Sequence, residues 1–177
     1  EPHPSTYKSL VRNINLNSDL KDIIYPINIA IGNKKSTVKF TDDKYLAVLN
    51  KISDKGEIEV PVSTLDEITK DIKKINLIKV DVEGYEKFVF ESAKNTLENT
   101  DCIYFESYES NYHDYNYTLG DIYQILKKSG FLIYKTKEDF SLEKIDENYR
   151  SIEKYENLIA LKNLDYYNQR MSEHFKK

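Results

Sequence analysis

Residues 75–91 read Ile-Asn-Leu-Ile-Lys-Val-Asp-Val-Glu-Gly-Tyr-Glu-Lys-Phe-Val-Phe-Glu. The apolar run from Leu77 to Val82 is short and rich in β-branched residues, which predicts a strand buried on both faces of a parallel sheet. After Gly84 the apolar side chains recur at helical spacing, at Tyr85, Phe88, Val89 and Ala93. A strand followed directly by a helix predicts an α/β fold. The residues between the two elements then lie at the carboxyl edge of the sheet, where ligands bind in open α/β sheets.

The rest of the chain predicts further helices and strands in an order that suits this fold. Helices are predicted over 5–17, capped by Ser5, over 64–74, opened by Thr64 and Glu67, and over 118–129, ended by Gly130. The predicted strands cover 23–31, 37–40, 58–62, 102–106, 131–134 and 157–161, and the predicted loops cover 41–56 and 136–156. This alternation predicts a Rossmann-like, mostly parallel sheet with flanking helices. We expect one domain over 1–164 and a C-terminal tail over 165–177 that is helical or frayed.

Composition limits the class of protein. A chain of 177 residues is long enough for one domain with a substantial core and too short for two ordinary ones. The net charge of −4, with both signs mixed, argues against a nucleic-acid-binding surface, and the Lys-rich stretches 70–74 and 127–128 suit solvated helix faces. No apolar run is long enough to span a membrane, and no signal segment opens the sequence. The single cysteine, Cys102, excludes an internal disulfide, so we expect a cytoplasmic protein without a membrane partner.

Several kinds of site are unsupported by the sequence. The five glycines form no Gly-x-Gly loop, so no phosphate-cradling motif is present. Three scattered histidines and one cysteine give no spacing typical of a metal site, and we expect no metal. We expect His3 and His174, near the chain ends, to be solvated. A serine hydrolase is unsupported because no Gly-x-Ser-x-Gly turn exists.

Acidic residues at strand ends are the best candidates for chemistry. Asp81 and Glu83 are two residues apart, so both side chains face the same way if the chain stays extended that far. Glu106 ends the next predicted strand and would face the same cleft. The structural alternatives are that Asp81 caps the following helix, that Glu83 is an exposed acid near a helix N-terminus, and that Glu106 pairs with a lysine or a backbone amide.

A tyrosine-dense segment, 108–117, follows Glu106 and contains His113. Aromatic faces and hydroxyl groups suit carbohydrate, so Tyr108 and Tyr112 are candidates for contact with a sugar or for a lid over it. His113 is a candidate general base. The alternative is compositional bias, since the chain contains fifteen tyrosines.

Several segments, in order, resemble FkbM-type methyltransferases, which use S-adenosylmethionine and have the class I Rossmann-like fold. The matching segments are Glu1-Pro2-His3-Pro4 with the helix to Asn17, Asn28-Ile29-Ala30-Ile31-Gly32, Val60-Pro61-Val62-Ser63-Thr64-Leu65-Asp66, Ile78-Lys79-Val80-Asp81-Val82-Glu83-Gly84-Tyr85-Glu86, Phe105-Glu106-Ser107, Gly130-Phe131 and Asn157-Leu158-Ile159. Each segment is weak alone. Their order and spacing over most of the chain make the set fairly specific.

The resemblance implies roles for particular residues. Glu1 would accept hydrogen bonds from both ribose hydroxyls of the cofactor, a task that suits a carboxylate. Ala30 and Ile31 would lie near the adenine. Asp81, Val82 and Glu83 would line the pocket beside the methionine part of the cofactor and the methyl acceptor, with Asp81 and Glu83 as catalytic candidates and Glu106 facing the acceptor.

One departure from the family is that its first core strand and Gly-rich loop would precede Glu1, and nothing in this sequence replaces them. A missing central strand would leave its neighbours' backbone groups unpaired, which is costly. This favours a fragment of a longer protein, a strand supplied by a partner or an artificially shortened chain over a truncated relative.

We expect methyl transfer to a hydroxyl of a small molecule or sugar, and homo-oligomerisation stays open. The alternative function is a non-catalytic relative whose fold serves association or partner binding.

Overall fold

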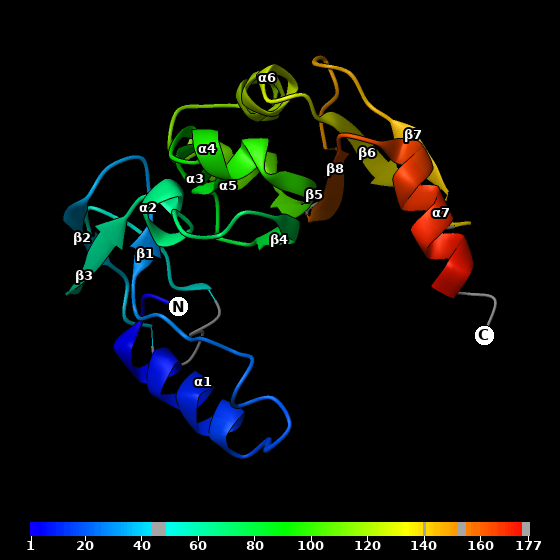
Figure 1. Ribbon diagram of the computed structural model, residues 1–177. Helices are drawn as coiled ribbons and strands as arrows, with labels where there is room; N and C mark the ends of the chain where they lie inside the picture. The colour runs from blue at the N-terminus through cyan, green and yellow to red at the C-terminus, as the bar shows by residue number, and fades with distance from the viewer. Residues whose placement is uncertain (44–48, 140, 152–154, 175–177) are drawn as a thin grey trace.

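The computed structural model describes residues 1–43, 49–139, 141–151 and 155–174. Its strands are β1 (Ala30–Ile31), β2 (Ser36–Phe40), β3 (Ile58–Ser63), β4 (Ile75–Val80), β5 (Thr100–Ser107), β6 (Leu132–Thr136), β7 (Leu142–Lys144) and β8 (Glu156–Leu161). Its helices are α1 (Pro4–Asn15), α2 (Leu65–Ile68), α3 (Glu86–Glu91), α4 (Lys94–Glu98), α5 (Glu109–His113), α6 (Leu119–Lys128) and α7 (Leu164–His174). Figure 1 shows these elements around two separate sheets, and the predicted α/β class is confirmed.

The larger sheet has five strands in the order β4-β5-β8-β6-β7. β4 and β5 are parallel, whereas β8 is antiparallel to both β5 and β6, and β7 is antiparallel to β6. The prediction of a mostly parallel sheet is therefore wrong. After β6 the chain returns through β7, which was missed inside the predicted loop 136–156. A return of this kind, without a helical crossover, places the next strand antiparallel.

β4 ends the larger sheet, and within the described residues it pairs with β5 alone. Leu77 is 57% exposed, because it lies on the face of the sheet that lines the cavity beside α7. The prediction that this strand is buried on both faces is wrong. A run of apolar residues indicates a strand, but its burial depends on which other elements cover its two faces.

The smaller sheet has the order β1-β3-β2, with β1 parallel and β2 antiparallel to β3. Its buried apolar side chains are Ala30, Phe40, Val60 and Val62. The predicted strand 23–31 is reduced to two residues after Pro26, whose ring removes a backbone donor. Within the predicted loop 41–56, residues 44–48 lie outside the described part of the chain.

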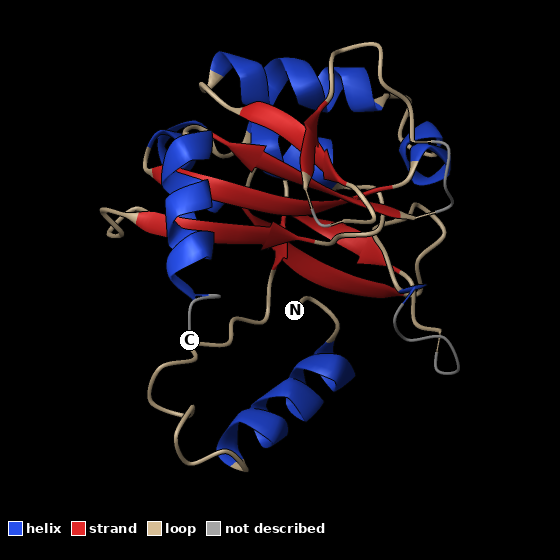
Figure 2. Ribbon diagram, turned by 90° about the vertical axis from the view of Figure 1, so that its right-hand side faces the viewer, coloured by secondary structure: helices blue, strands red, loops and turns tan. Residues whose placement is uncertain are grey.

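Helices cover the two faces of the larger sheet unequally. α3, α4 and α6 lie over one face and α7 lies against the other, as Figures 1 and 2 show from two directions. Alternation along β5 produces this division: Ile103 and Phe105 join the core beneath α3, α4 and α6, whereas Cys102 and Tyr104 lie on the face where Leu164 and Tyr167 pack. The second face is therefore only partly covered.

α1 lies beside the smaller sheet and away from the larger one (Figure 1). It begins after His3 and not at Ser5, and His3 makes no side-chain cap. The expectation that His3 is solvated is wrong, because its ring is buried between two partners. Nε2 lies 3.0 Å from Asp42 Oδ1 and Nδ1 lies 2.9 Å from Ser5 Oγ. These contacts attach the start of α1 to the end of β2.

The predicted helix starts and stops are mostly confirmed. Thr64 Oγ1 accepts from the Glu67 amide at 3.2 Å, although α2 is far shorter than the predicted 64–74. The carboxylate of Asp121 accepts from the Thr118 amide at 2.9 Å at the start of α6, and Gly130 follows its end with a φ of +85°. The short helix α5 was missed within the tyrosine-dense segment.

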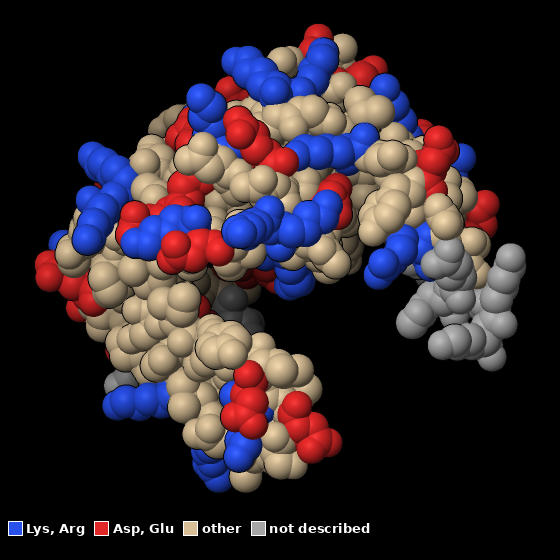
Figure 3. Space-filling view, in the orientation of Figure 1, with Lys and Arg blue, Asp and Glu red and all other residues tan. Residues whose placement is uncertain are grey.

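Among the described residues, no helix combines the length and apolarity needed to cross a membrane. Figure 3 shows Lys and Arg side chains interspersed with Asp and Glu over one face of the molecule.

Candidate functional site

The candidate site begins where β4 ends. Asp81 follows the strand directly, and the chain then leaves the extended conformation, with φ values of +54° at Glu83 and +95° at Gly84. Glycine adopts such values at little cost, whereas a glutamate there is unusual. The condition under which Asp81 and Glu83 would face the same way by strand alternation, an extended backbone up to Glu83, is therefore not met.

Asp81, Glu83 and Glu106 nevertheless come together. One carboxylate oxygen from each lies within 4.8 Å of the others. Leu77 pairs with Cys102 and Lys79 with Tyr104 across the parallel strands, so the same register brings Asp81 beside Glu106. The turn then brings Glu83 back to the pair. Asp81 does not cap the next helix, because the N-cap of α3 is Tyr85.

The clustered carboxylates change one another's ionisation. Burial, and then the charge of Asp81, raise the pKa of Glu83, while a hydrogen bond from Asn111 and the charge of Lys51 oppose the shift. Burial and the charges of Asp81 and Glu83 raise the pKa of Glu106. Lys79 Nζ lies 2.5 Å from Asp81 Oδ2, which raises the pKa of the lysine. The site thus concentrates negative charge, with Lys79 paired to Asp81 and Lys51 acting on Glu83.

The three acids form one wall of a cavity of about 630 Å³, here named the carboxylate cavity. The opposite wall comes from the N-terminal segment and the smaller sheet. The cavity is lined by Glu1, Pro2, Thr6, Ile29, Ala30, Ile31, Phe40, Asn50, Ile52, Asp81, Val82, Glu83, Tyr85 and Glu106. Glu1 Oε1 accepts from the His3 amide at 2.7 Å, which fixes the orientation of this carboxylate at the rim.

The structure brings together most of the residues predicted for the site. Glu1, Ala30, Ile31, Asp81, Val82, Glu83 and Glu106 all line the carboxylate cavity. Tyr108, Tyr112 and His113 are not among its lining residues. Tyr112 is 1% exposed and donates its hydroxyl to the Glu106 carbonyl oxygen at 3.1 Å, so it stabilises the end of β5 from the core side.

The structure gives Tyr108 and His113 other surroundings than the carboxylate cavity. The Tyr108 ring packs on Tyr155, with ring centres 4.6 Å apart, and His113 is exposed at the end of α5. The helical turn of α5 causes this placement, since it directs Tyr112 inward and His113 outward. The acceptor and base roles predicted for these three residues thus have no support from their positions.

Sequence reasoning missed Ile52, Asn50 and Tyr85 as lining residues. The loop before β3 carries no periodic pattern, so nothing in the sequence places Asn50 or Ile52 at a cavity. Tyr85 directly follows the Asp81–Gly84 turn, and its position there was a usable signal. Its ring lies 4.4 Å from Phe88 and 5.3 Å from Tyr115 between ring centres.

A second hollow, here named the lysine groove, adjoins the carboxylate cavity. It has a volume of about 960 Å³ and shares Ile52 and Tyr85 with that cavity. Its other lining residues include Lys39, Lys51, Lys55, Phe88 and Tyr115, together with the acids Asp54 and Asp114. Lys51 Nζ lies 2.7 Å from Asp114 Oδ2. Basic side chains and aromatic rings therefore lie directly beside the acidic wall.

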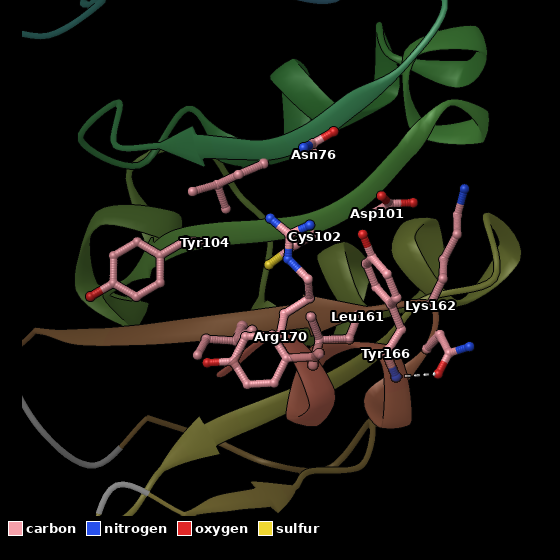
Figure 4. A pocket seen from close by; sticks show the side chains of 12 residues that line it. Asn76, Asp101, Cys102, Tyr104, Leu161, Lys162, Tyr166 and Arg170 are labelled. Carbon is pink, nitrogen blue, oxygen red and sulfur yellow. Dashed lines mark hydrogen bonds between the residues drawn. The ribbon is translucent and has the colours of Figure 1, made fainter. Parts of the chain in front are cut away.

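A third cavity, of about 410 Å³, lies between β4, β5 and β8 and helix α7 (Figure 4). Leu77, Tyr104 and Leu161 line it from the sheet, and Tyr166 and Arg170 line it from α7. Burial raises the pKa of the Cys102 thiol there to about 11, so the thiol is protonated near neutral pH. This cavity contains none of the predicted site residues.

Comparisons with known proteins give the family of the chain. A family model described as "Methyltransferase FkbM domain" matches residues 1–133. The chain is 25% identical over 109 residues to "Hexuronic acid methyltransferase AglP" of Haloferax volcanii, a match that covers 60% of this chain and 44% of that protein. The chain thus spans less than half the length of this curated relative. No solved structure matches.

Proposed function

The chain belongs to the FkbM methyltransferase domain family, and from this membership we propose that it transfers a methyl group from S-adenosylmethionine to a hydroxyl oxygen of a sugar or other small molecule. The observation that carries the proposal is the convergence of Glu1, Ala30, Ile31, Asp81 and Glu106 on one cavity. These residues come from four distant parts of the sequence. A structural role for each would not require them to share a surface.

The carboxylate cavity suits the chemistry of the donor. S-adenosylmethionine carries positive charge on its sulfonium and amino groups, and the acids of β4 and β5 would attract both. Glu1 would bind the ribose hydroxyls, with its orientation set by the His3 amide. Ala30 and Ile31 would offer apolar contact to the adenine. Domain 1–164 would thus bind the donor across the space between the two sheets.

Glu83 is the proposed general base. The acceptor oxygen forms a bond to the methyl carbon as the carbon–sulfur bond breaks, and the hydroxyl proton passes to the Glu83 carboxylate. S-adenosylhomocysteine leaves with the electron pair of the broken bond. Burial and Asp81 raise the pKa of Glu83, which makes it a stronger base than an ordinary glutamate. Asp81 is already paired with Lys79, so it would orient this lysine and the donor. The remaining task is alignment of the three reacting atoms.

The lysine groove is the proposed acceptor site. Tyr85 belongs to both hollows, so an acceptor that contacts its ring would lie next to the acids. Aromatic faces suit sugar rings, and Lys39, Lys51 and Lys55 would attract an acidic sugar. AglP is a hexuronic acid methyltransferase by name, which supports an acceptor of this chemical class. A uronic acid hydroxyl is therefore the first acceptor to test.

Donor binding is tested by isothermal titration calorimetry with S-adenosylmethionine and S-adenosylhomocysteine. We expect saturable binding of both, with weaker binding in Asp81→Asn and Glu106→Gln. Asp101→Asn is the matched control, because Asp101 lies on β5 but lines the third cavity. Ligand at a hundred times its dissociation constant should stabilise the fold by about 2.7 kcal/mol. Absence of binding at millimolar ligand would refute donor binding and favour the non-catalytic alternative.

The acceptor class is tested by following methyl transfer to a uronic acid and to its neutral parent sugar by mass spectrometry. Lys51→Gln should raise KM for the acidic sugar and leave KM for the neutral sugar unchanged. Lys73→Gln, which changes an exposed lysine outside all three hollows, is the control. Equal use of the two sugars, unaffected by Lys51→Gln, would contradict the acidic acceptor.

A further inference from the structure

We propose that Glu86 is a positioning residue of the donor site, which holds residues 82–84 in the form that directs Asp81 and Glu83 into the carboxylate cavity. The proposal rests on the proposed function for the identity of the donor. Its geometric part depends on the turn alone. Glu86 lines none of the three hollows and acts through the neighbouring turn.

Glu86 is an acid in the core, with 1% of its surface exposed. Its Oε1 accepts from the Val82 amide at 3.3 Å and from the Gly84 amide at 3.4 Å. Both donors belong to the turn that carries Glu83. A buried carboxyl group is expensive unless it is hydrogen-bonded, so its presence here indicates a specific task.

Tyr117 completes the contacts around the turn. Its hydroxyl lies 2.6 Å from the Gly84 carbonyl oxygen and 3.3 Å from Glu86 Oε2. The Gly84 amide and carbonyl are thus both bonded, one by each side chain. The turn needs this support because Glu83 has a φ of +54°, a value that costs a non-glycine residue conformational energy.

The number of hydroxyl protons available to these contacts indicates which protonation state of Glu86 satisfies all of them. Tyr117 has one hydroxyl proton, and a carbonyl oxygen can only accept, so the short contact to Gly84 uses that proton. The contact between Tyr117 and Glu86 is then a hydrogen bond only when Glu86 is protonated and donates. Neutral Glu86 satisfies every partner at once: Oε1 accepts from two amides and Oε2 donates to Tyr117.

The surroundings keep about half of Glu86 in this neutral form near pH 7. Burial raises the pKa of Glu86 to about 7, the backbone amides that bond its carboxylate oppose this shift, and the charge of Glu106 on β5 adds to it. The other titratable groups that face it are Tyr112 on α5 and Tyr115 and Tyr117 before α6. Lys87 is the nearby cation, with Nζ 5.7 Å from the centre of the Tyr117 ring.

Ionisation of Glu86 would change the bonding of the turn. The charged Oε2 is a stronger acceptor than a neutral carbonyl and would take the Tyr117 proton away from Gly84. The buried Gly84 carbonyl would then lose its partner, and the turn would lose one of its two attachments. Donor binding therefore weakens as the pH rises above neutrality, through a residue that never contacts the donor.

The experiment uses the whole chain and follows the Val82 and Gly84 amides by NMR from about pH 5.5 to pH 8.5. In the wild type the Gly84 amide should titrate with a midpoint near pH 7. Glu86→Gln should abolish this transition, because its amide group donates to Tyr117 as the neutral acid does. Glu91→Gln changes a partly exposed acid on the same helix and should leave the transition in place. Absence of the transition in the wild type, or its survival in Glu86→Gln, would overturn the proposal.

The donor part is measured by calorimetry with S-adenosylmethionine over the same pH range. If the donor binds only the form with neutral Glu86, wild-type affinity falls by up to about 16-fold between pH 7 and pH 8.5. Glu86→Gln should bind with a pH-independent affinity, and Tyr117→Phe should bind weakly throughout. A folded Glu86→Gln with the wild-type pH profile of affinity would refute the positioning role. Wild-type protein that binds no donor at any pH would refute the proposed function instead, while the NMR transition still reports on the turn.

Discussion

Substitution of Gly84 by alanine should be destabilising for two physical reasons, the backbone conformation at this position and the lack of space for a Cβ atom. The φ of +95° alone costs an L-residue about 1–2 kcal/mol. A Cβ at this position would also lie 2.8 Å from both Cβ and the carbonyl oxygen of Asn111. Because one of these atoms is backbone, the clash has no cheap relief and adds about 1–3 kcal/mol. Gly84→Ala should therefore lower the free energy of unfolding by about 2–5 kcal/mol.

Gly130→Ala is the matched control. Gly130 has a φ of +85°, but an added Cβ would meet no atom within 4 Å, so the backbone cost of about 1–2 kcal/mol stands alone. Urea denaturation followed by circular dichroism measures both variants by linear extrapolation. Equal losses in the two variants would refute the expected clash between the added methyl group and Asn111 of α5. Gly84→Ala should also weaken S-adenosylmethionine binding, and Gly130→Ala should not.

Three further predictions follow from burial and charge. Burial raises the pKa of Glu86 to about 7, so the folded state binds the Glu86 proton more tightly than the unfolded state does. The wild type should therefore lose on the order of 3 kcal/mol of stability relative to Glu86→Gln as the pH rises from about 4.5 to 7. A stability difference between the two proteins that stays constant with pH in urea titrations would contradict this. Leu126→Ala, at a side chain 0% exposed, should cost about 2–5 kcal/mol, and Leu132→Ala, at one 38% exposed, clearly less by the same urea assay. Lys79→Met removes the cation that opposes the upward pKa shift of Glu106, so a carboxyl carbon NMR titration should move to higher pH, and an unchanged midpoint would disprove the coupling.

Local pattern predicted the elements of the fold better than their arrangement. The strand before Asp81, the cap at Thr64 and the stop at Gly130 depend on neighbouring residues, and all three are confirmed. Strand direction depends on the return path of the chain, which propensity does not encode. The antiparallel β8 and the exposed edge of β4 were therefore predicted incorrectly.

The candidate site was predictable in part for the same reason. Asp81 and Glu106 each follow or end a strand, and parallel neighbours bring such positions together. Family resemblance added Glu1 and Ala30, which no local pattern could connect to the acids, and the predicted FkbM relationship is confirmed. Tyr112 and His113 were assigned from the chemistry of the tyrosine-dense segment 108–117. The turn of a five-residue helix, too short to recognise from sequence, decided their directions.

Two sets of side chains with different surroundings alternate along β5. The packed core buries Ile103, Phe105 and Ser107. The hollows on the other face are lined by Cys102, Tyr104 and Glu106. Inserting a single residue before Cys102 would exchange the two faces of the strand. It would direct an acid into the core and an apolar ring toward the site. Substitutions at every second position of β5 can therefore change the chemistry of the hollows and leave the core side chains in place. An insertion, in contrast, changes both faces of the strand at once.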